Sequence, residues 1–137
     1  YNDNCTINNC NIYDFTNATL AASGIKLDAG NTAWTITNNH IYQTTTINVT
    51  TSTAAYRAMW VTPNTASISN AANGFVITGN YIGGNAANGS GTYSMTGTAN
   101  YNFYAMDLSV GLGTATSVQN NTVTNWNFTA FFQTIYL

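Results

Sequence analysis

A six-residue pattern that recurs four times constrains the fold of this chain more than any other feature of its sequence. Each copy reads β-branched residue, polar residue, Asn or Gly, two variable residues, β-branched residue, and the copies begin at Ile7, Ile36, Ile77 and Val118. The starting positions are therefore 29, 41 and 41 residues apart. Repeats of this length are typical of folds that stack copies of one small unit.

A second pattern, apolar–variable–apolar, occurs once in each period. Its copies are Ile25-Lys26-Leu27, Met59-Trp60-Val61, Met106-Asp107-Leu108 and Ile135-Tyr136-Leu137. Such short alternating segments are unstable alone, but they can pair with their equivalents in stacked coils about 4.8 Å apart. We therefore predict an all-β fold, a right-handed parallel β-helix (β-solenoid) of about four coils with Asn-containing bends. Residues 1–137 are expected to form one such domain.

The stacking also predicts which side chains share a column. Three buried aliphatic columns are expected: Ile7, Ile36, Ile77 and Val118; Ile12, Ile41, Ile82 and Val123; Leu27, Val61, Leu108 and Leu137. Between the first two columns the chain must turn sharply, and a residue at positive φ allows this turn. Asn9, Asn38, Gly79 and Asn120 are expected to take that conformation.

The residue after each turn forms a further column. It contains Cys10, Asn39, Asn80 and Asn121. Stacked Asn amides can hydrogen-bond from coil to coil as a ladder, which Cys10 interrupts in the first coil. The structural interpretation competes with a ligand site made of these amides.

Composition excludes several classes of function. Only 4% of the residues are charged and the net charge is −2, so the chain has no basic surface for nucleic acid or anionic membranes. Its 13% aromatic content argues against disorder. No apolar run approaches the roughly 18 residues of a membrane span, so no membrane insertion is expected.

Cys5 and Cys10 are the two cysteines of the chain. A disulfide between them is possible in an oxidising compartment, although spacing alone does not establish the geometry. Two thiols without a His or carboxylate cluster make a poor zinc site, and no metal or other cofactor is expected.

The repeats of this chain resemble those of a known class of proteins. Its Ile–Asn-Asn–Ile coils resemble the parallel β-helix repeats of the pectate-lyase superfold. The stretches 34–42 and 77–85 resemble large secreted surface proteins of Bacteroidota-type bacteria. This superfold includes lyases, hydrolases, adhesins and filament proteins, so the resemblance implies the fold more specifically than the function.

Polysaccharide-cleaving members of this superfold use Asp clusters, or Asp with Lys and Arg, on the outer face of one sheet. Glycoside hydrolysis needs two carboxylates about 5 to 10 Å apart. Asp28 and Asp107 are expected on one face but two coils apart, at or beyond that limit. His40, the only histidine, is expected to be a surface residue. We therefore predict that the chain is not an enzyme.

A binding face is a stronger hypothesis. The residues Lys26, Trp60, Asp107 and Tyr136 are expected to share one exposed column, with Arg57 close to Trp60. Exposed aromatic rings suit sugar rings, and further aromatic residues in or near loops are expected to add to this surface: Tyr93, Tyr101, Phe103 and Tyr104. The alternative is that these rings cover loop edges or pack against a neighbouring subunit. Recurring Thr-x-Thr segments also raise an ice-binding alternative, but the outward columns that contain them are mixed in composition.

Neither end of the predicted solenoid shows an evident cap. We therefore expect further β-helix coils, of the same or of an identical chain, at both ends. The predicted function is an extracellular or cell-surface structural or adhesive element that builds a rod, a surface protein or a filament. The alternative is a β-helix that binds or degrades polysaccharide around Trp60 and Asp107.

Overall fold

The computed structural model describes residues 2–51, 54–62, 72–129 and 131–136, the last of these segments by its backbone alone. Strands are the predominant regular structure of the described chain, and its one helical element is a short 3-10 turn, η1 (Ala87–Gly89). All pairings between its strands are parallel. The predicted all-β character is confirmed.

Three sheets follow the predicted repeats, and each is named here after its first strand. The β2 sheet contains β2 (Thr6–Asn8), β6 (Thr35–Thr37), β10 (Val76–Thr78) and β14 (Ser117–Gln119). The β3 sheet contains β3 (Asn11–Tyr13), β7 (His40–Tyr42), β11 (Tyr81–Ile82) and β15 (Thr122–Val123). The β4 sheet contains β4 (Ala22–Leu27), β9 (Ala55–Val61), β13 (Asn102–Leu108) and β17 (Phe131–Tyr136).

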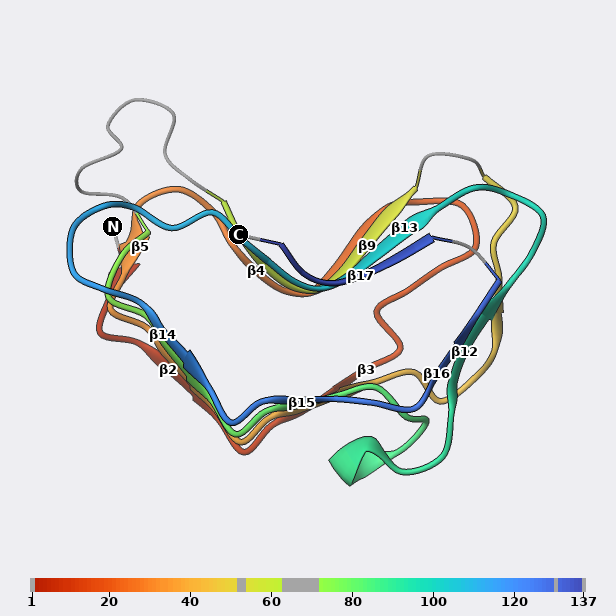
Figure 1. Ribbon diagram of the computed structural model, residues 1–137, viewed down its shortest axis with the longest axis horizontal. Coiled ribbons are helices and arrows are strands. Elements are labelled where there is room, and N and C mark those ends of the chain that lie inside the picture. Colours follow the sequence, from red (N-terminus) through yellow and green to blue (C-terminus); the bar gives the residue numbers. More distant parts are fainter. Residues whose placement is uncertain (1, 52–53, 63–71, 130, 137) are drawn as a thin grey trace.

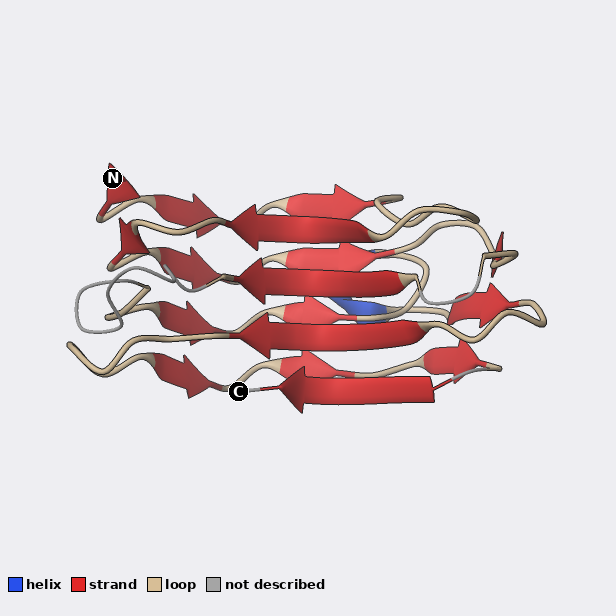
Figure 2. Cartoon of the chain, turned by 90° about the horizontal axis from the view of Figure 1, so that it is seen from above, coloured by secondary structure: helices blue, strands red, loops and turns tan. Residues whose placement is uncertain are grey.

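Two further sheets lie where only loops and turns were expected. The β8 sheet contains β8 (Ile47–Asn48), β12 (Tyr93–Thr96) and β16 (Trp126–Phe128), and a two-stranded sheet pairs β1 (Asn2–Asp3) with β5 (Asn31–Thr32). The chain visits the β2, β3 and β4 sheets in the same order four times, and we call each passage a tier. Tier 1 runs through β2–β4, tier 2 through β6–β9, tier 3 through β10–β13 and tier 4 through β14–β17. Figure 2 shows these tiers stacked side by side.

The register between tiers agrees with the predicted columns. Ile7, Ile36, Ile77 and Val118 are paired in that order across the β2 sheet. The second column, from Ile12 to Val123, is paired in the same way across the β3 sheet. In the third, Leu27 pairs with Val61 and Val61 with Leu108, whereas Leu137 lies outside the described residues.

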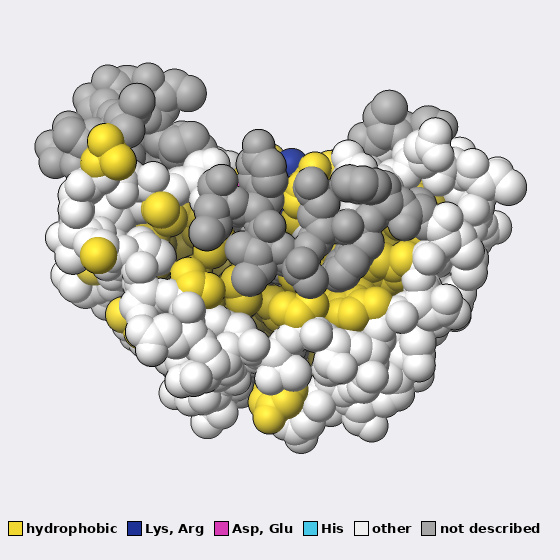
Figure 3. Space-filling view, in the orientation of Figure 1, with side chains coloured by type: hydrophobic (Ala, Val, Ile, Leu, Met, Phe, Trp, Pro, Cys, Tyr) yellow, Lys and Arg dark blue, Asp and Glu magenta, His cyan; other side chains and the backbone are white. Residues whose placement is uncertain are grey.

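These columns form the sides of one apolar core, and hydrophobic side chains gather in the middle of the view along the stack (Figure 3). Their members in tiers 2 and 3 are almost fully buried, whereas those of the β2 and β3 sheets in tiers 1 and 4 are partly buried. Large aromatic side chains fill the space between the sheets: Tyr56, Phe75, Tyr93, Tyr101 and Phe103 are all buried. Tyr93, Tyr101 and Phe103 are therefore core residues, and the expectation that they belong to a loop surface was wrong.

The β4 sheet is bent toward the core, so that its outer face is concave (Figure 1). The cause lies at one position of each strand, where two successive residues face inward. These are Ala58 and Met59 in β9, and Ala105 and Met106 in β13. Gly24 occupies the same region of β4, where a Cβ would lie only 2.8 Å from the Ala58 carbonyl oxygen. Small residues therefore permit the bend, and the bend shapes the surface described next.

Candidate functional site

Two outward columns of side chains flank the bend of the β4 sheet. Ser23, Arg57 and Tyr104 are paired on one side of it. On the other side, Lys26 pairs with Trp60, Trp60 with Asp107, and Asp107 with Tyr136. The predicted column of Lys26, Trp60, Asp107 and Tyr136 is therefore confirmed in register, while the side chain of Tyr136 lies outside the described part of the chain.

Arg57 reaches across the bend and joins the two columns. Its guanidinium carbon lies 4.1 Å from the centre of the Trp60 ring and 5.1 Å from that of Tyr104. Its Nε donates to Asp107 Oδ2 at 2.5 Å, forming an ion pair between tiers 2 and 3. Arg57 thus lies close to Trp60, as predicted, and its charge is neutralised by Asp107.

Asp107 itself corrects an expectation. It was expected to be exposed, but it is only 7% exposed. The Arg57 side chain, which lies against Asp107 from the neighbouring tier, accounts for part of this burial. A carboxylate at this depth needs such a partner, because an unpaired buried charge is strongly destabilising. We therefore interpret Asp107 as part of an ion pair between tiers and not as an exposed sugar-binding acid.

A pocket of about 280 Å³ lies on this concave face. It is lined by Ala21, Ala22, Ser23, Lys26, Ala55, Arg57 and Trp60. Alanine and serine leave room on one side, while the Trp60 ring and the two cations form the other. Lys26 Nζ is 4.8 Å from the centre of the Trp60 ring, so both cations lie against the same indole. The pocket combines a ring with several hydrogen-bond donors.

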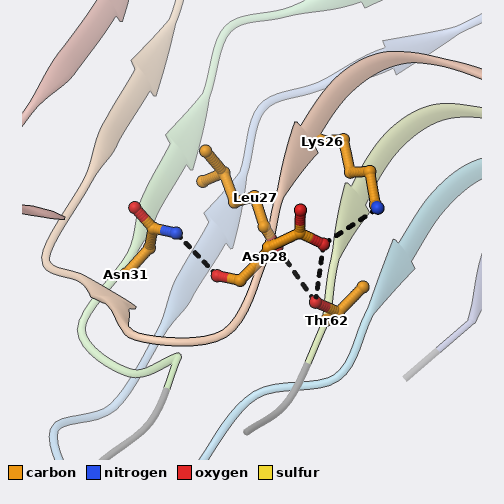
Figure 4. A network of polar contacts seen from close by, with 5 residues as sticks. All are labelled: Lys26, Leu27, Asp28, Asn31 and Thr62. Carbon is orange, nitrogen blue, oxygen red and sulfur yellow. Dashed lines mark hydrogen bonds and ion pairs between the residues drawn. The ribbon is translucent and has the colours of Figure 1, made fainter. Parts of the chain in front are cut away.

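Lys26 also belongs to a polar network at the end of β4 (Figure 4). Its Nζ lies 2.9 Å from Asp28 Oδ1, and both side chains are largely exposed. Thr62 Oγ1 donates to the Leu27 carbonyl and to Asp28 Oδ1, and Asn31 Nδ2 donates to the Asp28 carbonyl. Asp28 therefore pairs with Lys26 and Asp107 with Arg57, so each carboxylate of the considered catalytic pair is bound to its own cation.

The turns between the β2 and β3 sheets have the predicted conformation. Asn9, Asn38, Gly79 and Asn120 have φ angles of 57°, 54°, 68° and 53°. Most residues with a Cβ adopt this region only at an energetic cost. Gly avoids that cost because it has no Cβ, and Asn tolerates the conformation better than most other residues. The four-fold repetition of the turn aligns the residue that follows it in every tier.

Those following residues form the expected amide ladder. Asn80 Oδ1 accepts from both the backbone N–H and Nδ2 of Asn39, each at 3.0 Å. Asn121 Oδ1 accepts from the same two groups of Asn80, at 3.0 and 2.8 Å. In tier 1, Cys10 contributes only its backbone N–H, which donates to Asn39 Oδ1 at 3.0 Å. The ladder satisfies buried groups of the protein, which favours its structural interpretation over a ligand site.

The two cysteines are free thiols, so the suggested disulfide is not formed. Strand β2 lies between them, and three extended residues alone cover about 10 Å. Two Cα atoms more than about 7 Å apart cannot be bridged without moving the backbone. The Sγ atoms instead lie near backbone carbonyls, Cys5 near Asp3 and Cys10 near Asn8.

The structure reveals an aromatic surface that the sequence analysis missed. On the outer face of the β3 sheet, Tyr13 stacks on Tyr42 with ring centres 5.2 Å apart, and Tyr13 is 54% exposed. Beside them, His40 makes an edge contact with Tyr81 and a hydrogen bond to Asn11. The sequence contained a signal for this surface, because Tyr13 and Tyr42 each come directly after the last residue of a copy of the six-residue pattern.

Two further observations limit the chemistry of the described residues. They contain no group of three or more His, Cys, Asp and Glu side chains arranged to hold a metal ion. Nor does any helix in the described segments have the length and apolar character needed to cross a membrane.

Comparison of the chain with protein-family models, with curated proteins and with solved structures finds no match. Its function therefore has to be inferred from the chemistry of these surfaces.

Proposed function

We propose that this chain is a non-catalytic, extracellular structural or adhesive element with the architecture of a right-handed parallel β-helix. The observation that carries this proposal is the unbroken repetition of the tiers, which keep one register in the β2, β3 and β4 sheets. Right-handedness is the expected form, because parallel strands in one sheet are joined by right-handed crossovers in about 98% of known cases.

The hydrogen bonds between tiers support a structural role. In a stack of parallel strands, every tier is bonded to its neighbours through backbone groups, and the Asn39–Asn80–Asn121 ladder adds side-chain bonds in the same direction. Such a stack can be lengthened without changing its cross-section. This is the property that a rod, a stalk or a filament needs.

The state of the carboxylates supports a non-catalytic role. Asp107 binds Arg57, Asp28 binds Lys26, and Asp14 accepts from Gln43 and Thr44. Asp3 accepts a hydrogen bond from Thr32. Because glycoside hydrolysis requires two carboxylates that flank one bond, acids distributed in this way favour a structural function.

An extracellular location fits the polar but almost uncharged composition. With only 4% charged residues, the outer faces rely on Thr and Asn for their polarity. A small freely diffusing domain ordinarily carries more charge for solubility, whereas an anchored or polymerised protein needs less. We further propose that additional β-helix coils pair with the edge strands of tiers 1 and 4.

Immunogold labelling of source cells and cryo-electron microscopy of the labelled native material test this proposal. The expected result is label on the cell surface, on rods with a strand repeat of about 4.8 Å along their axis. Label confined to the cell interior, or strands that run along the rod axis, would contradict it.

A second candidate function is carbohydrate binding on the concave face of the β4 sheet. The observation that favours it is the pocket of about 280 Å³ that brings Trp60 together with the donors of Lys26, Arg57 and Ser23. Aromatic rings with a few directed polar groups are typical of ligand sites. Because Asp107 already binds Arg57, Lys26 is the cation whose partner is mainly exposed and most easily exchanged.

Glycan-array screening followed by calorimetry of any ligand found tests this second function. Trp60→Ala is expected to weaken binding at least about tenfold, the effect of losing roughly 1.4 kcal/mol. Tyr42→Ala, which removes an aromatic ring from a different sheet, is the matched control and should leave the affinity unchanged. A glycan that binds both variants equally, or a wild-type chain that binds none, would exclude this site.

A further inference from the structure

We infer that the open edge formed by β14 and β15 is a docking surface for a further β tier that carries an asparagine at the ladder position. We further infer that Cys10 makes the first tier of a second copy of this chain a weaker partner for this edge than a tier with asparagine would be. The inference rests on the proposed function, in which further coils pair with the edge strands, and it specifies the chemistry of the partner.

The hydrogen bonds that a partner asparagine would make with β14 and β15 already occur at three junctions between tiers within the chain. At each junction, an amide oxygen of the later tier accepts from the backbone N–H of Cys10, Asn39 or Asn80, at 3.0 Å in all three cases. The nitrogen of the same amide donates to a carbonyl in the β2 sheet of the earlier tier, at 2.9 to 3.0 Å. These carbonyls belong to Ile7, Ile36 and Ile77. One carboxamide thus satisfies one donor and one acceptor at every junction.

Tier 4 presents the same pair of groups at the edge of its sheets. By register, the Asn121 N–H is equivalent to that of Asn80, and the Val118 carbonyl is equivalent to that of Ile77. β14 and β15 are the last strands of their sheets in the described chain. The Asn121 side chain is itself held by Asn80 and by the Ile77 carbonyl, so the site is oriented before a partner arrives. A partner tier with Asn at this position would repeat the three internal junctions.

The opposite edge of the molecule does not offer that amide. Cys10 occupies the ladder column in tier 1, and its Sγ lies 3.4 Å from the Asn8 carbonyl oxygen. A thiol is only a weak acceptor, so it is a poor replacement for an amide oxygen. If two copies stacked head to tail, the Asn121 N–H of one would face the sulfur of the other and lose a good acceptor on burial.

The neighbouring columns do not oppose self-stacking. Ile7 would follow Val118, and Ile12 would follow Val123, so both aliphatic columns would continue between copies. All four of these side chains are only partly buried and still have apolar area to cover. In these two sheets, the mismatch between copies is therefore located at Cys10.

Because the mismatch is located at one residue, substitution of Cys10 tests the inference directly. Sedimentation equilibrium in reducing buffer would compare the wild-type chain with Cys10→Asn, Cys10→Leu and Cys5→Asn. Cys10→Asn supplies the amide, and it is expected to tighten end-to-end association about tenfold, the effect of one or two added hydrogen bonds. Cys10→Leu matches the size of asparagine without its amide, and Cys5→Asn places the amide outside the ladder. Neither control should show the gain.

Three results would overturn the inference: a Cys10→Asn chain that associates no more tightly than wild type, an equal gain in Cys10→Leu, or an equal gain in Cys5→Asn. Adding Asn121→Ala to Cys10→Asn should reduce the gain without abolishing it, because alanine keeps the backbone N–H of residue 121 and the Val118 carbonyl and removes only the Nδ2 donor; circular dichroism would show whether that double variant folds. Failure here would leave the proposed function intact, because cell-surface location and axial strand repeat are measured on native material.

Discussion

Replacing Asn80 by alanine is expected to destabilise the fold by at least about 3 kcal/mol. The side chain is fully buried, and its amide accepts from the backbone N–H and Nδ2 of Asn39. It also donates to the Ile36 carbonyl at 2.9 Å and to Asn121 Oδ1 at 2.8 Å. Alanine removes all four bonds, and the buried Asn39 N–H loses the acceptor that Asn80 supplied. A buried donor left in this way costs about 1 to 3 kcal/mol, and each remaining lost bond adds about 0.5 to 1.5 kcal/mol at most.

Urea unfolding followed by circular dichroism measures this effect. Asn100→Ala is the matched control, because Asn100 is exposed and lies outside the strands. Surface substitutions of this kind usually change stability by no more than about 0.5 kcal/mol. If Asn80→Ala cost as little as Asn100→Ala, the ladder would not contribute to stability, and the structural interpretation of the Asn column would be refuted.

An aspartate at position 80 separates hydrogen bonding from packing. An ionised carboxylate keeps the shape of the amide but cannot donate to Ile36 or Asn121, whereas a protonated one can donate once. Burial disfavours the charged form, so the folded-state pKa of this carboxyl should exceed its unfolded value of about 4. The variant should therefore be most stable below that pH and lose stability as the pH rises through the folded-state pKa. Asn80→Ala should show no such dependence, and equal pH profiles of the two variants would contradict the explanation.

Three further predictions concern other parts of the molecule. Because Asn9 has a φ of 57°, Asn9→Ala should cost about 1 kcal/mol in thermal unfolding and Asn9→Gly close to nothing; equal costs would contradict the bend explanation. Arg57→Met leaves Asp107 without its cation and should cost about 3 kcal/mol in urea unfolding, part of which an added Asp107→Asn should restore. Burial raises the pKa of Tyr93, so stability should fall as the pH rises above about 10, and Tyr93→Phe should fall less steeply; identical alkaline profiles would refute this.

The sequence was sufficient to predict the columns because two independent periodicities had to agree. Alternation within each strand decides which face a residue occupies, and the repeat decides which residue lies above it. A register error of one residue would have exposed Ile36 and Ile77, which are both fully buried. The turns were predictable for a similar reason, since few residue types accept a positive φ.

The β8 sheet could not be predicted in the same way. Its strands Ile47–Asn48, Tyr93–Thr96 and Trp126–Phe128 lie in segments whose lengths differ between tiers, so no fixed spacing identifies them. Tyr93, in the second of these strands, was therefore assigned to a loop surface. In the structure the sheets lie far enough apart that large rings are needed between them, as shown by the edge contact of Tyr93 with Phe103 at 5.4 Å.

Asp107 shows where column reasoning fails. Register correctly placed it between Trp60 and Tyr136, and alternation correctly directed it outward. Part of its burial comes from Arg57, which belongs to the other outward column and reaches Asp107 across the bend of the β4 sheet. A bend produced by two successive inward residues breaks the alternation on which the prediction was based.

The bend also separates the two proposed roles of the molecule. It hollows the β4 sheet into the face that contains Trp60, while the amide ladder follows the junction between the β2 and β3 sheets. Variants of one region therefore leave the contacts of the other in place. If Trp60→Ala removed glycan binding and left unfolding unchanged while Asn80→Ala did the reverse, the chain would be an adhesive built on a structural stack. If both variants altered only stability, the concave face would be one more contact that holds the tiers together.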